Sequence, residues 1–387
     1  MSVSALPSAY SNTTQQVDYS FKDLHLPYYP PNADCQDYMI PVAVVWDKLQ
    51  FNGTKFQNDY DLEDFLSVAT TREPGPNYPS PLGPITKVNT TYQIAASFCS
   101  PKVSSPKEKT VIVATHGIAL ARQHWNSAYR PDDYNFVQHA VSKGYSVFFY
   151  DRVGCGASQK ISGYEAQINT AISVLQSLTR LVKSGAYTGR IGVPSKVALM
   201  GFSFGSYTTH GAVSLSPDLA DAVILTAIGF NKTGLNVNGL VRSYANRIAA
   251  QQSPATYGDR DTGYLTWVDK YAQIMNYLKA PNYDTTAIEY AEAGKEPYAV
   301  TEFLTLLSGP QNVDGYKGPA LHLTGEDDYI FCDGYCPGIF EEPAKTIYKN
   351  AKLELALHPG ASHNLNFHKN ATGAYEVITG FLERSGL

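Results

Sequence analysis

Short apolar runs recur along the chain from Thr110 onward, and amphipathic segments separate them. Most of the runs are hydrophobic at successive positions, which is typical of parallel strands buried on both faces of a sheet. The predicted strands are residues 111–115, 145–150, 196–200, 222–227, 319–324 and 352–358.

The intervening segments carry apolar residues every three or four positions, as a helix with one buried face does. They predict helices over 134–143, 163–183, 204–215, 342–350 and 372–384. Alternating strands and helices predict an α/β fold with a mostly parallel central sheet and helices on both of its faces. Ligands of such folds bind at the carboxyl ends of the strands.

The N-terminal part of the chain does not follow this alternation. Residues 1–84 are rich in Tyr, Pro, Asn and Asp and have weak periodicity. They predict an extension packed on the core, with one helix near 61–71. A strand is expected at 92–99.

A second interruption lies between two of the predicted strands. Residues 231–317 are too long for a structureless loop. Helical patterns at 264–278 and 300–307 predict a helical cap, or lid, inserted over the carboxyl end of the sheet. The core is then expected to comprise residues 85–230 and 318–387.

Composition narrows the functional classes. The chain has 30 basic and 35 acidic residues, a net charge of −5 and no basic cluster, so it lacks the electrostatic footprint of a nucleic-acid-binding protein. No stretch approaches the roughly 20 apolar residues that cross a bilayer. Charged residues are 17% of the chain, below the roughly 25% of typical soluble domains, which is common in secreted proteins. No signal peptide is visible in this chain.

Sequons and cysteines also favour an extracellular protein. Five sequons predict glycosylation at Asn12, Asn52, Asn89, Asn231 and Asn370. The chain has five cysteines, which leaves one unpaired if two disulfides form. We expect Cys35–Cys99, which would tie the extension to the first strands, and Cys332–Cys336, a short loop closure. Cys155 is expected to be the free thiol.

The strongest chemical signal is the run Gly201-Phe202-Ser203-Phe204-Gly205, which matches G-x-S-x-G. It follows a predicted strand and precedes a helix-compatible segment. Glycines suit a sharp turn of this kind because side chains on either side of the serine would collide with backbone. We therefore predict that Ser203 is a nucleophile at the N-terminus of a helix.

A serine hydroxyl needs a neighbouring base to take its proton. His363 follows the last predicted strand on a glycine-containing loop, where an imidazole can reach the serine. We predict that it is the general base. His358, which ends the strand, is expected to be structural, and His368 is the weaker competitor.

An acid should orient the imidazole. Asp328 follows the preceding strand, three residues after Gly325, and is the predicted acid, with Asp327 as the alternative. The resulting order of serine, acid and histidine is the order of an α/β hydrolase.

Acyl transfer also needs donors for a developing oxyanion. The Phe204 N–H is one expected donor. The second should come from the loop after residues 111–115, with Ile118 as the prediction and Ala119 as the alternative. We expect His116 to shape this loop by hydrogen bonding.

These motifs, in this order, resemble the α/β-hydrolase superfamily of lipases, esterases and peptidases. The pieces that match are His116-Gly117, the elbow at Ser203, residues 325–328, residues 360–363, and Asp151-Arg152-Val153-Gly154-Cys155-Gly156-Ala157-Ser158, a turn that is structural in the family. One departure is Ile118-Ala119-Leu120, where many lipases have a glycine-rich run. The extension and the insertion resemble those of secreted fungal serine esterase-like and lipase-like hydrolases, which implies a helical cap.

The resemblance implies hydrolysis of a small-molecule carboxylic ester or lactone through an acyl-enzyme, without a cofactor or metal. Ala119, Trp267 and Tyr271 are candidate substrate-pocket residues. The alternatives are a proline-iminopeptidase-like serine peptidase, which would need cap carboxylates, and a lyase or cyclase of fungal secondary metabolism. The sequence does not predict the oligomeric state.

Overall fold

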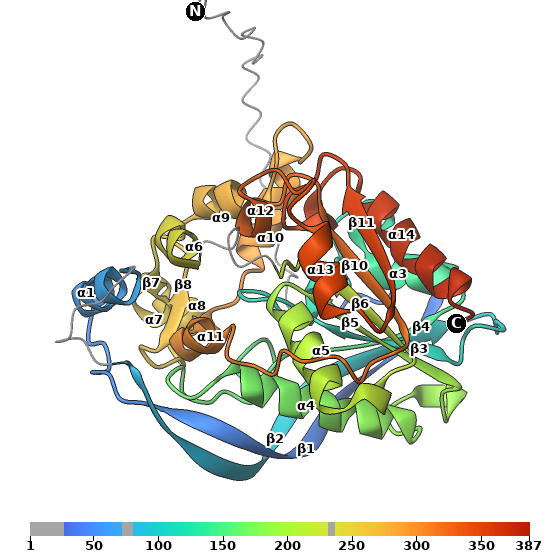
Figure 1. Ribbon diagram of the computed structural model, residues 1–387, viewed down its shortest axis with the longest axis horizontal. Helices are drawn as coiled ribbons and strands as arrows, with labels where there is room; N and C mark the ends of the chain where they lie inside the picture. The colour runs from blue at the N-terminus through green and yellow to red at the C-terminus, as the bar shows by residue number, and fades with distance from the viewer. Residues whose placement is uncertain (1–26, 72–79, 231–236) are drawn as a thin grey trace, which may run out of the picture.

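The central feature of the molecule is an eight-stranded sheet (Figure 1). The computed structural model describes residues 27–71, 80–230 and 237–387. The strand order is β1-β2-β4-β3-β5-β6-β10-β11. Six strands are parallel: β3 (Thr110–Thr115), β4 (Ser146–Tyr150), β5 (Lys196–Phe202), β6 (Ala222–Thr226), β10 (Pro319–Gly325) and β11 (Lys352–His358). This arrangement confirms the predicted fold class.

Helices cover both faces of the sheet. On one face α4 (Ile168–Lys183) packs against α5 (Phe204–Leu215), and on the other α3 (Phe136–Ser142) packs against α14 (Ala371–Arg384) (Figure 1). The remaining core helices are short: α2 (Pro131–Tyr134), α12 (Tyr329–Cys332) and α13 (Glu341–Ile347). Strands β3 to β6 are buried almost throughout, which explains their continuous apolar runs.

The N-terminal extension differs from its prediction. Its expected single helix is α1 (Asp59–Ala69), but it also contains β1 (Ala33–Phe51), which pairs antiparallel with β2 (Leu82–Pro101) along nearly its whole length. Burial in β1 alternates strictly at residues 40–46. The exposed positions include the apolar Met39 and Val45, so the sequence lacks the hydrophobic contrast that identifies a strand.

The described part of the insertion forms a cap of short helices and a small sheet. The helices are α6 (Val237–Ser243), α7 (Ala249–Gln252), α8 (Pro254–Tyr257), α9 (Lys270–Tyr277), α10 (Thr285–Ala293) and α11 (Val300–Thr305). The sheet comprises β7 (Arg247–Ile248), β8 (Tyr264–Thr266) and β9 (Tyr298–Ala299). The helix predicted over 264–278 is therefore wrong at its start. The Asp269 side chain accepts the N–H groups of Tyr271 and Ala272 and begins the helix there.

The extension contacts the cap as well as the core. Strands β1 and β2 run along the bottom of the molecule in this view, and α1, which lies between them in the sequence, is beside β7 (Figure 1). Asp59 Oδ1 accepts the Ile248 N–H at 2.8 Å, and Arg242 Nε donates to Thr70 Oγ1 at 2.8 Å. These bonds link the extension to one side of the cap.

Two disulfides are present, Cys35–Cys99 and Cys332–Cys336, and Cys155 is a buried free thiol. Cys35 and Cys99 lie directly opposite each other in the β1–β2 register. Within the described ranges, no helix has both the length and the apolar character to cross a membrane.

The sequons lie in different settings. Asn52 and Asn89 are exposed, whereas Asn370 is half-buried and its Nδ2 donates to the Pro359 carbonyl at 2.8 Å. A glycan on Asn370 would be attached to this hydrogen-bonded nitrogen. Asn12 and Asn231 lie outside the described residues.

Candidate active site

Ser203 occupies the sharp turn between β5 and α5. Its φ of 54° and ψ of −117° are strained for a residue with a side chain, and its N–H is held by the Thr226 carbonyl at 3.0 Å. A Cβ on Gly201 would collide with the Gly205 carbonyl, and a Cβ on Gly205 would collide with the Thr115 carbonyl. Glycine at both positions is therefore required by close backbone contact.

The structure brings Ser203, His363 and Asp328 together in one hydrogen-bonded chain. Ser203 Oγ lies 2.9 Å from His363 Nε2, and His363 Nδ1 lies 3.0 Å from Asp328 Oδ2. The His363 and Asp328 side chains are completely buried, whereas Ser203 is half-buried. With a carboxylate at Nδ1, the Nδ1–H tautomer is favoured, which leaves Nε2 to accept the serine proton.

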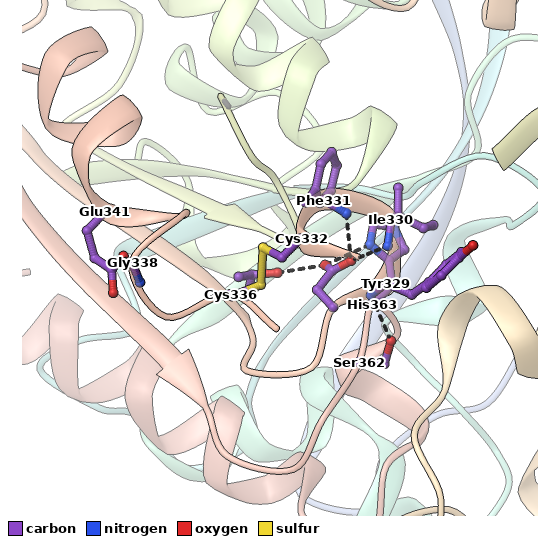
Figure 2. The surroundings of a disulfide bond; sticks show 11 residues. Tyr329, Ile330, Phe331, Cys332, Cys336, Gly338, Glu341, Ser362 and His363 are labelled. Atoms are coloured by element: carbon purple, nitrogen blue, oxygen red, sulfur yellow. Dashed lines mark hydrogen bonds and ion pairs between the residues drawn. A yellow bond between two sulfur atoms is a disulfide. The ribbon is translucent and has the colours of Figure 1, made fainter. Parts of the chain in front are cut away.

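Local bonds hold the Asp328 carboxylate in place. Asp328 is the N-cap of α12, and its Oδ1 accepts the N–H groups of Ile330 at 2.9 Å and Phe331 at 3.2 Å. Its Oδ2 also accepts the Thr324 hydroxyl at 2.7 Å. Figure 2 shows this turn, with the Cys332–Cys336 disulfide directly after it and His363 nearby.

The competing acid and histidines have other partners. Asp327 is an ion-pair partner of Lys279 at 3.3 Å. His358 Nε2 lies 2.9 Å from the Asn370 carbonyl. His368 accepts the N–H groups of Lys279 and Ser362, and burial lowers the pKa of His368 to about 4.

The loop after β3 passes close to the serine turn. Neither the Ile118 N–H nor the Phe204 N–H has a hydrogen-bond partner among the residues that the structure describes, so both could bind an oxyanion. The Ala119 N–H is equally unpartnered, and Ala119 stays the alternative. Ala119 has a φ of 61°, and its carbonyl accepts the Glu296 N–H of the cap at 3.0 Å.

His116 fixes the conformation of this loop. Its Nδ1 lies 2.8 Å from the Gly117 carbonyl oxygen, and its Nε2 accepts the Arg152 N–H at 3.0 Å. Burial and the positive charge of Arg152 hold the pKa of His116 well below its usual range. A neutral imidazole with both nitrogens engaged fits the loop-shaping role expected from the sequence.

Aromatic rings surround His363. The rings of Phe202, Tyr277 and Phe331 lie 5.3, 5.2 and 5.3 Å from the imidazole. The Tyr277 hydroxyl is hydrogen-bonded to the Tyr244 hydroxyl at 2.7 Å. A pair of cap tyrosines therefore lies beside the triad of Ser203, His363 and Asp328. The sequence had given no reason to place Tyr244 here.

Of the predicted cap residues for the pocket, only Trp267 lies near the site. Its ring is fully buried, 5.7 Å from that of Tyr277. Tyr271 is 62% exposed, so its assignment to the pocket is wrong. The buried face of α9 is formed by Ala272, Gln273, Asn276 and Tyr277, and Tyr271 lies on the other side of that helix.

A cavity of about 300 Å³ lies between the core and the cap, and its lining includes Arg122, Asp151, Tyr290 and Glu296. Burial raises the pKa of Glu296 to about 7, and the Asp151 carboxylate adds to this shift. None of the three triad residues lines this cavity.

Several solved structures share the fold. An esterase from Thermogutta terrifontis is 16% identical, with a TM-score of 0.52 over 76% of this chain and 95% of that chain. A peroxisomal alpha-beta-hydrolase from Saccharomyces cerevisiae is 11% identical, with a TM-score of 0.51 over 92% of this chain and 89% of that chain. A structure from a study of Nitrososphaera gargenis carboxylesterases is 16% identical, with a TM-score of 0.51 over 76% and 96%.

Among curated proteins, no sequence matches the chain. The model of the alpha/beta hydrolase family matches residues 111–373, which comprise most of the chain and include all three members of the hydrogen-bonded chain at Ser203. The chain therefore belongs to the alpha/beta hydrolase family.

Proposed function

We propose that this protein is a serine hydrolase that cleaves a carboxylic ester or lactone through an acyl-enzyme. The observation that carries the proposal is the continuous hydrogen-bonded chain from Ser203 through His363 to the buried Asp328. A serine is a useful nucleophile only when a base is within hydrogen-bond reach and is itself oriented by a third group. Both conditions are met by side chains, so the proposed chemistry requires neither a metal nor an organic cofactor.

In the proposed reaction, Ser203 Oγ attacks the substrate carbonyl carbon while His363 Nε2 takes the hydroxyl proton. Asp328 stabilises the resulting imidazolium. The N–H groups of Phe204 and Ile118 bind the oxyanion of the tetrahedral intermediate. When that intermediate collapses, the bond to the leaving oxygen breaks and Nε2 protonates the departing alcohol. Water then attacks the acyl-enzyme by the same steps and releases the acid.

The surroundings of the triad support an apolar acyl group. Phe202, Tyr277 and Phe331 surround His363, and such rings exclude water from a reacting ester. Two of the similar structures come from studies of esterases, which makes an ester the first bond to test. The two disulfides support a secreted protein, which we propose as its location.

A peptidase of the proline-iminopeptidase type would need free carboxylates in the cap to hold a substrate amine. Glu289 is an ion-pair partner of Lys270, and Glu292 pairs with Lys295 and accepts the Trp267 indole N–H. These two carboxylates are already engaged, and the third candidate, Glu296, lines a cavity whose lining includes none of Ser203, His363 and Asp328. We therefore place the ester ahead of the amide and make the amide an outcome of the test.

The test measures hydrolysis of p-nitrophenyl esters of increasing acyl length and of one amino-acid p-nitroanilide by wild type and Ser203→Ala. We expect ester turnover in wild type and a loss of at least about 10³-fold in the variant. Turnover of the anilide alone would favour the peptidase. Ester turnover that survives in Ser203→Ala, or no reaction of Ser203 with a fluorophosphonate probe, would overturn the proposal.

A further inference from the structure

Arg152 is a buried cation that lies against both parts of the proposed oxyanion hole. Its side chain is 2% exposed, and its guanidinium carbon lies 4.4 Å from the centre of the Phe204 ring. Its Nη2 donates to the Gly117 carbonyl oxygen at 3.3 Å. The sequence placed Arg152 in a turn with a structural role and gave no indication of these contacts.

The contact with Gly117 determines the direction of the next N–H group. A peptide bond is planar and trans, so its C=O and its N–H point in opposite directions. The Gly117 carbonyl accepts from Arg152 Nη2 and from His116 Nδ1, which holds it on the side of these two groups. The Ile118 N–H must then point away from them. If this peptide turned over, a carbonyl oxygen would replace the donor and would repel an oxyanion.

The cap supplies the anion that fixes Arg152. Arg152 Nη1 forms an ion pair with Glu302 Oε1, and the Glu302 side chain is 4% exposed. Glu302 Oε2 accepts the Ala299 N–H at 3.1 Å, so cap backbone holds the carboxylate at the start of α11. A buried ion pair of this kind need not add stability, but losing either partner leaves an uncompensated buried charge, so the guanidinium is held beside Glu302.

We propose that Arg152 is a positioning residue, which the cap residue Glu302 orients and which holds the Gly117–Ile118 peptide with its N–H available to the oxyanion. This inference rests on the proposed function, and it deepens that proposal by making the oxyanion hole depend on a contact from the cap. Arg152 does not touch the reacting atoms. It acts through the Gly117 carbonyl and through the ring of Phe204.

The experiment compares Arg152→Met with Arg260→Met, a matched control in the cap. Arg260 is also buried, with 5% exposure, pairs with Asp259, lies 5.6 Å from the Tyr264 ring centre and has an unpartnered Nε, as Arg152 has. Its hydrogen bonds and ion pairs do not include the Gly117 carbonyl. Both variants lose a buried guanidinium that lies against an aromatic ring. Arg152→Met alone loses the contact with the proposed oxyanion loop, and it also leaves the buried Glu302 unpaired, whereas the Asp259 partner of Arg260 is 61% exposed.

Three quantities are measured: the rate constant for fluorophosphonate labelling of Ser203, kcat and KM on the best p-nitrophenyl ester, and Ki for a trifluoromethyl ketone that forms a tetrahedral oxyanion adduct with serine. Losing one oxyanion donor costs about 10²–10³-fold in kcat, and a misoriented donor should cost less. For Arg152→Met we expect labelling and kcat to fall about 10–100-fold, KM to change less than about threefold, and Ki to rise by the factor that kcat falls. Arg260→Met should keep kcat within about threefold.

Two results would overturn the inference: a folded Arg152→Met with nearly wild-type kcat, or a fall in kcat without a matching rise in Ki. If Arg152→Met does not fold, Glu302→Gln decides the question, because it keeps the arginine and exchanges its charged partner for a neutral one. That variant should lose about 3–10-fold in kcat and in ketone affinity alike. Failure of the proposed function is distinguishable, because it removes labelling from wild type as well.

Discussion

The proposed catalytic residues lie on three loops that are far apart in the sequence, and bonds to backbone groups hold Ser203 and Asp328 in place. Ser203 is held by the Thr226 carbonyl, and Asp328 accepts the N–H groups of the turn that follows it. Such support matters because a catalytic hydrogen bond loses value when its groups can rotate away. Of the two adjacent acids, only Asp328 is bonded to His363, whereas Asp327 pairs with Lys279.

Replacing Asp328 by Asn should remove the charge but keep the turn, because asparagine is also a good helix N-cap. We expect kcat/KM for an ester to fall about 10³–10⁴-fold, since the amide no longer stabilises the imidazolium or selects its tautomer. Asp327→Asn is the matched control. It should stay within about threefold of wild type, because Asp327 is bonded to Lys279 and not to His363. Equal losses in the two variants would contradict the assignment of the acid.

At the residue scale, the sequence could predict the positions of the proposed nucleophile and base because their motifs are local. The glycines around Ser203 reflect close backbone contacts that only a residue without a Cβ allows. Contacts between distant segments leave no such mark. Glu302 lies 150 residues from Arg152, and nothing in its own segment identifies its partner.

Among the elements, a strand or helix was predictable when burial produced a strong pattern. Strands β3 to β6 are apolar almost throughout because helices cover both faces of the sheet, and each of the six parallel strands was found within a few residues of its bounds. Strand β1 was missed because apolar residues also occupy its exposed face. In the cap, β7, β8 and β9 are too short to establish a period of two.

One of the two disulfides lies beside the proposed site and the other does not. We therefore expect only the first to affect activity, and both to affect stability. Cys332–Cys336 closes the turn after α12 (Figure 2). In this turn the Cys336 N–H donates to the Glu326 carbonyl at 2.8 Å, and the Gly334 N–H donates to the backbone carbonyl of Asp328. Cys35–Cys99 joins β1 to β2, away from the triad. Removing each pair separates the effect on activity from the effect on stability.

For Cys332→Ala/Cys336→Ala we expect kcat to fall about 3–10-fold, because the Asp328 turn loses a restraint, and the free energy of unfolding to fall by about 1–2 kcal/mol, because the closed loop is short. For Cys35→Ala/Cys99→Ala we expect a loss of about 3–4 kcal/mol, because the loop spans 64 residues, with kcat unchanged. Ester kinetics and urea denaturation of both variants provide the measurement. An unchanged kcat in Cys332→Ala/Cys336→Ala would show that the disulfide beside Asp328 does not support the site.

At the scale of the whole molecule, the interior contains several histidines that are neutral in the folded state. Burial lowers the pKa values of His124 and His322 to about 3, and those of His210 and His368 to about 4. Each is depressed below its unfolded value of about 6.5. The stability that these groups contribute is therefore present above pH 6.5 and is lost as the pH falls, because only the unfolded chain takes up their protons.

His322 offers the sharpest test of this acid sensitivity. It lies in β10 with 0% exposure, beside the rings of Phe230 and Tyr348, and neither of its ring nitrogens has a hydrogen-bond partner within the part of the chain that the structure describes. His322→Leu removes two unsatisfied polar atoms and should raise the free energy of unfolding at pH 7 by about 1 kcal/mol.

The pH dependence separates this titration effect from a simple gain in packing. Between pH 7 and pH 5 the unfolded wild type gains a proton at His322 that the folded protein excludes, so the advantage of His322→Leu should grow by about 2 kcal/mol. The other buried histidines are common to both proteins, and their contributions cancel in the difference. Urea denaturation of wild type and His322→Leu at pH 7 and pH 5 measures this difference in the free energy of unfolding. An advantage that is independent of pH would mean that His322 binds a proton in the folded state as readily as in the unfolded chain, and that acid sensitivity arises elsewhere in the molecule.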